Sequence, residues 1–199
     1  MIELFSSDTP NGKKISIMLE EIGYEYKVTK IDLSKGEQFK PEFVKISPFS
    51  KIPTIVDHDN KESVFESGAI LIYLAEKSRK FYDKKNKLKI DQWLMAQMGI
   101  VGPFIGQYHY FYKFNKGLSK IGEKRYFEIT KNIYNILDKQ LINNKFLAGE
   151  DYSIADIATW PWIARHQWHD IGLKKYSYLC EWYQMIAERP GVIKGYKFM

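Results

Sequence analysis

Hydrophobic and polar positions in the first 80 residues follow two different periodicities in turn. Short runs with the composition of β-strands cover residues 2–5, 26–32, 51–57 and 63–65. Between and after them, apolar residues recur every three or four positions in 14–22 and 41–46 and from Ser67 onward, which is typical of amphipathic helices. The predicted order is β-α-β-α-β-β-α. It indicates a parallel first pair of strands and a hairpin from the last two strands.

The pattern changes after residue 78. Residues 78–88 are polar and charged, as in a linker between domains. From residue 89 onward the periodicity is only helical, with helices expected from Trp93, over 126–141, from Ser153 and over 179–188. Glycines and a proline between residues 99 and 106 predict a break in the first of these helices. We therefore predict an α/β domain over residues 1–80, a linker over 81–88 and an all-helical domain over 89–199.

Composition narrows the classes of function. The net charge of +6 is scattered in short groups such as Lys13–Lys14, so we expect solvated surface rather than a nucleic-acid-binding face. The single cysteine, Cys180, excludes an intramolecular disulfide and a CxxC redox pair, and we expect it to be a small core residue. The four histidines have no metal-ligand spacing. We find no signal-peptide pattern and no apolar run near 18 residues, and expect a cytoplasmic protein without a membrane span.

Three polar motifs are candidates for ligand binding. The turn at residues 6–12, before the first helix, is either a helix cap or a chemical centre. Ile52-Pro53 interrupts a strand, and it indicates either a trans proline in an edge strand or a cis bond that turns the backbone of Ile52 toward an extended peptide ligand. Glu66-Ser67 begins a helix, where Ser67 is expected to cap the helix, and where a carboxylate and an ammonium group of one ligand would also fit.

A fourth motif is structural. Ser153-Ile-Ala-Asp156 has the spacing of a capping box, in which each of the two polar side chains binds the other residue's backbone N–H. From general helix-cap substitutions, we expect the loss of either side chain to cost about 1 kcal/mol.

Six stretches occur in an order and at spacings that resemble the glutathione transferase superfamily. They are TPNGKKISIMLEE, DLSKGEQFKPEFVKISP, KIPTIVDH, FESGAILIYLAEK, QWLMAQMGIVGPFIGQ and YSIADIATWPW. In detail they look like the bacterial nu-class enzymes, which are glutathione-dependent disulfide-bond reductases. The resemblance implies a thioredoxin-like α/β N-terminal domain, an all-α C-terminal domain and a homodimer.

The resemblance also implies where the chemistry takes place. The family's usual catalytic Tyr, Ser or Cys is missing, and the thiol of glutathione faces a Thr-Pro-Asn turn, which is Thr9-Pro10-Asn11 here. A helix N-terminus and hydrogen-bond donors favour a thiolate over the thiol. Thr9 and Asn11 can donate but are not strong bases, so the implied role is to stabilise a thiolate. Ser7 stays an alternative donor, because Ser6-Ser7 is more polar than the family's apolar pair.

Further glutathione contacts follow from the same resemblance. The implied binding residues are Gln38, Lys51, Ile52, Pro53, Glu66, Ser67 and Arg125, with Arg125 in an E-K-R-Y context that has one residue more than the family's E-R-Y. The aromatic segment 108–114 departs from the family pattern, and residues 108–112 are expected to line the pocket of the second substrate.

The resulting hypothesis is a cytoplasmic, homodimeric disulfide-bond reductase that uses glutathione as co-substrate and no metal. Its partners are glutathione and a disulfide or an electrophilic small molecule, without nucleic acid or membrane. Two alternatives stay open: a transferase that conjugates glutathione to apolar electrophiles, and a non-catalytic, dimeric glutathione-binding module.

Overall fold

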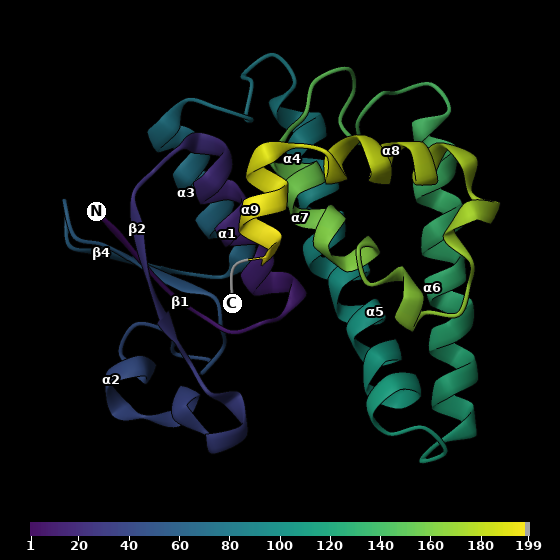
Figure 1. Ribbon diagram of the computed structural model, residues 1–199, viewed down its shortest axis with the longest axis horizontal. Helices are drawn as coiled ribbons and strands as arrows, with labels where there is room; N and C mark the ends of the chain where they lie inside the picture. The colour runs from purple at the N-terminus through teal and green to yellow at the C-terminus, as the bar shows by residue number, and fades with distance from the viewer. Residues whose placement is uncertain (198–199) are drawn as a thin grey trace. The chain divides into compact units, whose positions relative to one another are not determined.

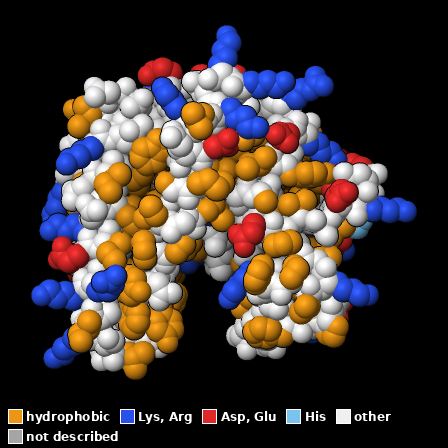
Figure 2. All heavy atoms as spheres, turned by 180° about the vertical axis from the view of Figure 1, so that it is seen from behind, with side chains coloured by type: hydrophobic (Ala, Val, Ile, Leu, Met, Phe, Trp, Pro, Cys, Tyr) orange, Lys and Arg blue, Asp and Glu red, His pale blue; other side chains and the backbone are white. Residues whose placement is uncertain are grey.

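The computed structural model describes residues 1–197, and the chain folds as two compact units. Of the described residues, 1–82 and 188–197 make the first unit, and 83–187 make the second. No helix within the described residues is both long and apolar enough to cross a membrane. On the face drawn in Figure 2, Lys and Arg side chains are spread around the surface rather than gathered in one patch.

A four-stranded sheet in the order β2-β1-β3-β4 forms the centre of the first unit. Its strands are β1 (Ile2–Ser6), β2 (Tyr26–Lys30), β3 (Thr54–Asp57) and β4 (Glu62–Phe65). As predicted, β1 and β2 are parallel, and β3 and β4 form an antiparallel hairpin. The expected strand over 51–57 begins only at Thr54, after the proline that cannot donate a ladder hydrogen bond.

Alternation along β1 separates the two faces of this sheet. Leu4 is buried beneath α1 (Pro10–Ile22) and α3 (Ser67–Ser78), which pack together on one face (Figure 1). Phe5 points to the other face, where its ring lies 6.3 Å from that of Phe43 in the short helix α2 (Pro41–Val44). The sheet is therefore fully covered on one face and only partly on the other.

The C-terminal helix α9 (Pro190–Lys197) belongs to the first unit, although the sequence predicted one helical domain over 89–199. Gly195 lets α9 lie directly on α1: a Cβ there would be 2.5 Å from the Cα of Ile17. The Ser16 hydroxyl donates to the Gly195 carbonyl at 2.7 Å, and Arg189 donates two hydrogen bonds to Glu21 at 2.7 and 2.8 Å. The prediction of the domain extent is corrected accordingly.

The second unit is helical, as predicted. Its α-helices are α4 (Lys87–Ala96), α5 (Gly102–Tyr108), α6 (Lys120–Leu141), α7 (Ile154–Ile163) and α8 (Ser177–Ala187). The predicted break is a π-helical stretch at Gln97–Val101. Gly102 follows it directly, and a Cβ there would lie only 3.0 Å from the Nε2 of Gln97. The half-buried Cys180 on α8 is less enclosed than the predicted core position.

The capping box at the start of α7 is present and is larger than its motif. Both reciprocal bonds of Ser153 and Asp156 form, and the fully buried Asp156 carboxylate also accepts from the backbone N–H of Leu147 and the indole N–H of Trp182, both at 2.9 Å. Burial raises the pKa of this carboxyl, against the effect of the donors around it. Asp156 is thus a junction between a loop and two helices of the second unit.

A chain of buried polar rings lies in the same unit. His109 Nε2 and His169 Nε2 are 2.7 Å apart, and His169 Nδ1 is 2.6 Å from the hydroxyl of Tyr134. Tyr108 is also buried, and its hydroxyl donates to the carbonyl of His169 at 3.0 Å. Tyr108 and His109 are therefore core residues, whereas the sequence predicted that residues 108–112 line a substrate pocket. Of that segment, Tyr110 is exposed.

Candidate functional site

The strand register brings three predicted motifs to one edge of the sheet, the side at which β1 and β4 end and β3 begins. Phe5 pairs with Thr54, so the turn that follows β1 lies beside Pro53 at the start of β3. Thr54 also pairs with Phe65, so the residues that follow β4, Glu66 and Ser67, reach the same edge. The backbone ladder alone therefore gathers segments that are up to 60 residues apart in the sequence.

The polar turn after β1 is a helix cap. Thr9 is the N-cap of α1, and its Oγ1 accepts from the backbone N–H of Gly12 at 3.1 Å. Because Oγ1 is the acceptor in this bond, the hydroxyl hydrogen of Thr9 can be donated elsewhere. The amide side chain of Asn11 is half-buried and has no hydrogen-bond partner among the described residues. The turn thus presents two side-chain donors at the N-terminus of a 13-residue helix.

Ser7 is differently placed. Its hydroxyl donates to the carbonyl of Ile31, which follows β2, and the side chain is buried. A hydroxyl has one hydrogen to donate, so this bond removes Ser7 as a donor to a ligand as long as it persists. Among the hydroxyls that the sequence left open in this turn, the geometry favours Thr9.

The Ile52-Pro53 peptide bond is cis, one of the two forms that the sequence left open. Neither the N–H nor the C=O of Ile52 has a hydrogen-bond partner among residues 1–197. Pro53 is buried and Lys51 is exposed. Ile52 therefore presents one backbone donor and one acceptor, the pair that an extended peptide ligand needs.

The start of α3 differs from the prediction that Ser67 caps it. Glu66 is the N-cap residue, with φ of 68°, and Ser67 is the first helical residue. A positive φ in a non-glycine residue costs on the order of 1–3 kcal/mol and is found where neighbouring structure, often at a ligand clamp, enforces it. The Ser67 hydroxyl oxygen accepts from the ammonium group of Lys14 at 3.1 Å, and both side chains are buried.

Lys14 is the site residue that the sequence reasoning missed. Lys13 and Lys14 were expected on solvated surface, but they are only 3% and 1% exposed. The signal was present in the helical spacing, since Lys14 stands four residues before the fully buried Met18 on the same face of α1.

Two further predicted binding residues lie outside these three motifs. Gln38 lies in the connection between β2 and α2, and its Oε1 is buried without a hydrogen-bond partner among the described residues. Arg125 is exposed on α6 of the second unit. An unpaired buried amide oxygen is costly, so a ligand that pairs with it would be favoured at Gln38.

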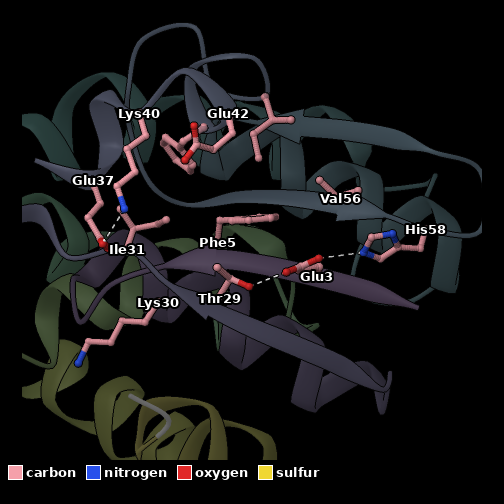
Figure 3. Close-up of a pocket in the computed structure, with 12 residues that line it drawn as sticks. Glu3, Phe5, Thr29, Lys30, Ile31, Glu37, Lys40, Glu42, Val56 and His58 are labelled. Carbon is pink, nitrogen blue, oxygen red and sulfur yellow. Dashed lines mark hydrogen bonds and ion pairs between the residues drawn. The ribbon is translucent and has the colours of Figure 1, made fainter.

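A cavity of about 440 Å³ lies on the partly covered face of the sheet. Figure 3 shows Phe5, Ile31 and Val56 along it, with Glu3 at one end between Thr29 and His58. The Thr29 hydroxyl bond, together with His58 and Lys27, holds the pKa of the Glu3 carboxyl below its usual range despite partial burial. None of the predicted site residues lines this cavity, so the cavity does not indicate where glutathione binds.

No group of three or more His, Cys, Asp or Glu side chains suited to hold a metal occurs in the part of the chain that the structure describes.

Comparisons with known proteins match most of the chain. Residues 2–76 match the model of the glutathione S-transferase N-terminal domain, and residues 102–190 match that of the C-terminal domain. The chain is 44% identical over 197 residues to the disulfide-bond oxidoreductase YfcG of Escherichia coli K12, covering 96% of this chain and 92% of the relative.

Solved structures extend the likeness. A glutathione transferase family member from Pseudomonas fluorescens, with two glutathione molecules bound, is 38% identical with a TM-score of 0.91, over 98% of this chain and 92% of that one. A glutathione transferase from Pseudomonas putida, with one glutathione disulfide per subunit, is 37% identical with a TM-score of 0.91, over 99% and 91%. The predicted fold, a thioredoxin-like domain and a helical domain, is confirmed.

Proposed function

Because the chain belongs to the glutathione S-transferase family, we propose that it is a glutathione-dependent disulfide-bond oxidoreductase whose glutathione binds at the sheet edge formed by the Thr9 turn, Ile52-Pro53 and Glu66-Ser67. The observation that carries the proposal is the register that gathers these motifs, with the backbone groups of Ile52 unpaired between them. The names of the relatives support the reaction class.

Each end of a glutathione molecule has a complementary group at this edge. The N–H and C=O of Ile52 pair with the ligand's backbone, as in an added strand. The Ser67 hydroxyl and the backbone N–H groups at the N-terminus of α3 donate to the γ-glutamyl carboxylate, and Glu66 pairs with the ammonium group beside it. The side-chain amide N–H of Gln38 and the ammonium group of Lys51 bind the other carboxylate, and Arg125 is a further proposed glutathione contact. The Oε1 of Gln38, which has no partner among the described residues, is an acceptor and would pair with an N–H of the ligand.

The reaction is then two thiol–disulfide exchanges. A glutathione thiolate attacks one sulfur of the substrate disulfide, forms a mixed disulfide and releases the other sulfur as a thiolate. A second glutathione thiolate attacks the glutathione sulfur of the mixed disulfide, which yields glutathione disulfide and the second substrate thiolate. The N-terminus of α1 and the donors of Thr9 and Asn11 favour the attacking thiolate, while the substrate disulfide is reduced by two electrons from two glutathione molecules.

Replacing Asn11 with alanine is expected to lower kcat/KM for glutathione-dependent reduction of a small disulfide by about tenfold to a hundredfold. A hydrogen bond to a charged group contributes roughly 1.5–3 kcal/mol, and 1.4 kcal/mol corresponds to a factor of ten. Thr9→Ala is expected to act in the same direction. The measurement is steady-state reduction coupled to glutathione disulfide formation.

Ser7→Ala is the matched control in the same turn, since its hydroxyl donates to Ile31. We expect it to change the rate by about twofold or less at neutral pH, in keeping with a neutral hydrogen bond outside the chemistry. Unchanged turnover in Asn11→Ala, or a loss confined to Ser7→Ala, contradicts the assignment. Assays of the same preparations with a chloronitrobenzene acceptor separate reduction from conjugation.

We further propose that the protein is a nu-class enzyme and a cytoplasmic homodimer. Exposed rings on the first unit support self-association: Phe49 and Phe65 are 71% and 36% exposed, with ring centroids 6.3 Å apart. Light scattering after size exclusion is expected to give about twice the 23.5 kDa chain mass. Phe49→Ser is expected to shift the mass toward one chain, whereas Ile121→Ser, at an exposed position of the second unit, leaves it unchanged. A monomeric wild type contradicts the dimer.

A further inference from the structure

Lys14 is a buried lysine that contacts Ser67, a residue of the proposed glutathione site. Its side chain comes from the second turn of α1, is 1% exposed and contacts Ser67, which is 4% exposed. An ammonium group has donors only, so Ser67 Oγ must be the acceptor of this bond, and the hydroxyl hydrogen of Ser67 then points away from Lys14. The lysine therefore fixes the direction in which Ser67 can donate.

The groups that face Lys14 and its neighbours come from α3, α1, α9 and β1. From the start of α3, Glu66 is the acidic group whose field favours the ammonium form. From α1 itself, the neighbouring Lys13 pairs with Asp8 at 3.5 Å and lies 5.5 Å from the ring of Tyr196 in α9. From β1, the side chain turned to this face near the site is Ser6, which is uncharged. Burial lowers the pKa of Lys14 to about 7, and Glu66 offsets part of this effect.

A buried ammonium group is stable only when opposite charge or hydrogen bonds compensate for lost hydration. An anion bound through Ser67 would add a second negative charge to that of Glu66, since it would lie on the far side of the same hydroxyl. We propose, on the basis of the glutathione-binding function above, that Lys14 is a positioning residue of the carboxylate subsite: it orients Ser67, and its ammonium form balances the γ-glutamyl carboxylate of bound glutathione. Binding of glutathione is then accompanied by proton uptake at Lys14 above neutral pH.

The test is calorimetric titration with S-methylglutathione, whose blocked thiol cannot titrate, at pH 6 and pH 8. With a free-state pKa of about 7, linkage predicts that wild-type affinity is roughly tenfold weaker at pH 8 than at pH 6. Lys14→Met is expected to bind at least about tenfold more weakly at pH 6, with no change between the two pH values. Lys14→Arg keeps its charge at both, and is expected to restore binding at pH 6 and to remove the pH dependence.

Two controls separate this role from a structural one. Lys13→Met removes the neighbouring buried ammonium group and is expected to bind as tightly, and with the same pH dependence, as wild type. A glutathione analogue that lacks the γ-glutamyl carboxylate is expected to bind wild type with no change between pH 6 and pH 8, a measurement that needs no variant. Folding of each variant is checked by its melting temperature.

Wild-type binding of S-methylglutathione that does not change between pH 6 and pH 8 overturns the inference, and so does a folded Lys14→Met protein that binds like wild type. Failure of the proposed function has a different result, because wild type then binds neither S-methylglutathione nor glutathione at either pH. A lower melting temperature in Lys14→Met with unchanged affinity assigns Lys14 to folding alone and also overturns the inference.

Discussion

Replacing Asp156 with alanine is expected to lower the free energy of unfolding by at least about 3 kcal/mol. The substitution leaves three N–H donors, the backbone N–H groups of Leu147 and Ser153 and the indole N–H of Trp182, without their acceptor, and it also removes the acceptor of the Ser153 hydroxyl. A buried donor that loses its partner costs about 1–3 kcal/mol, and three are lost here. This exceeds the value of about 1 kcal/mol that the capping motif alone predicts. Denaturant unfolding, followed by tryptophan fluorescence and circular dichroism, measures the change.

Ser153→Ala is the matched control, because it removes the cap hydroxyl but leaves the carboxylate and its other donors. Its expected cost is about 1 kcal/mol. Asp156→Asn keeps the shape but places an NH₂ group among N–H donors, so it should lose much of the same stability as alanine. If Asp156→Ala and Ser153→Ala cost the same, Asp156 is an ordinary helix cap and its role as a junction is wrong.

Acidification from pH 7 to pH 5 is expected to destabilise the helical unit through His109 and His169. Burial, with Arg165 nearby, lowers the pKa of His109 to about 4, and burial lowers that of His169 well below its usual range. Below the unfolded pKa of about 6.5, these histidines are protonated in the unfolded chain but stay neutral in the folded chain. The free energy of unfolding therefore decreases as the pH decreases. For His109 the loss between pH 7 and pH 5 is about 2 kcal/mol by this linkage.

The contact between the two histidine rings also predicts that acid lowers the free energy of unfolding. Two Nε2 atoms 2.7 Å apart share one hydrogen, and full protonation of both rings would place two N–H groups against each other. Unfolding free energies at pH 7 and pH 5 for wild type, His109→Gln and the exposed-ring control His58→Gln test the effect. The decrease should be smaller in His109→Gln than in the other two proteins. An equal decrease in all three proteins assigns the acid sensitivity to other groups.

Much of the fold could be predicted because its signals are local. Strand and helix periodicities, the proline at residue 53 and the capping spacing of Ser153 and Asp156 each depend on a few adjacent residues. The candidate site could be predicted for the same reason, since the motifs at Thr9, Ile52 and Glu66 are short. The resemblance to one superfamily then placed them in a common framework, and the sheet register brings the three motifs together in space.

What escaped prediction depends on residues that meet only in three dimensions. His109 and His169 are 60 positions apart, and neither lies in a motif. The contact of Lys14 with Ser67 spans 53 positions, and a pair of lysines is usually solvated. Helix α9 joins the first unit because Gly195 fits against Ile17, a steric condition that helical periodicity does not show.

The strand ladder also bears on when, during folding, the protein becomes able to bind its ligand. Pairing of Phe5 with Thr54 closes a loop of about 50 residues, and such long-range contacts form only after their entropy cost has been met. Before that pairing, the Thr9 turn and Ile52 have no fixed separation. The proposed glutathione site therefore forms only with the completed sheet, and a ligand that binds there would stabilise the native state by mass action.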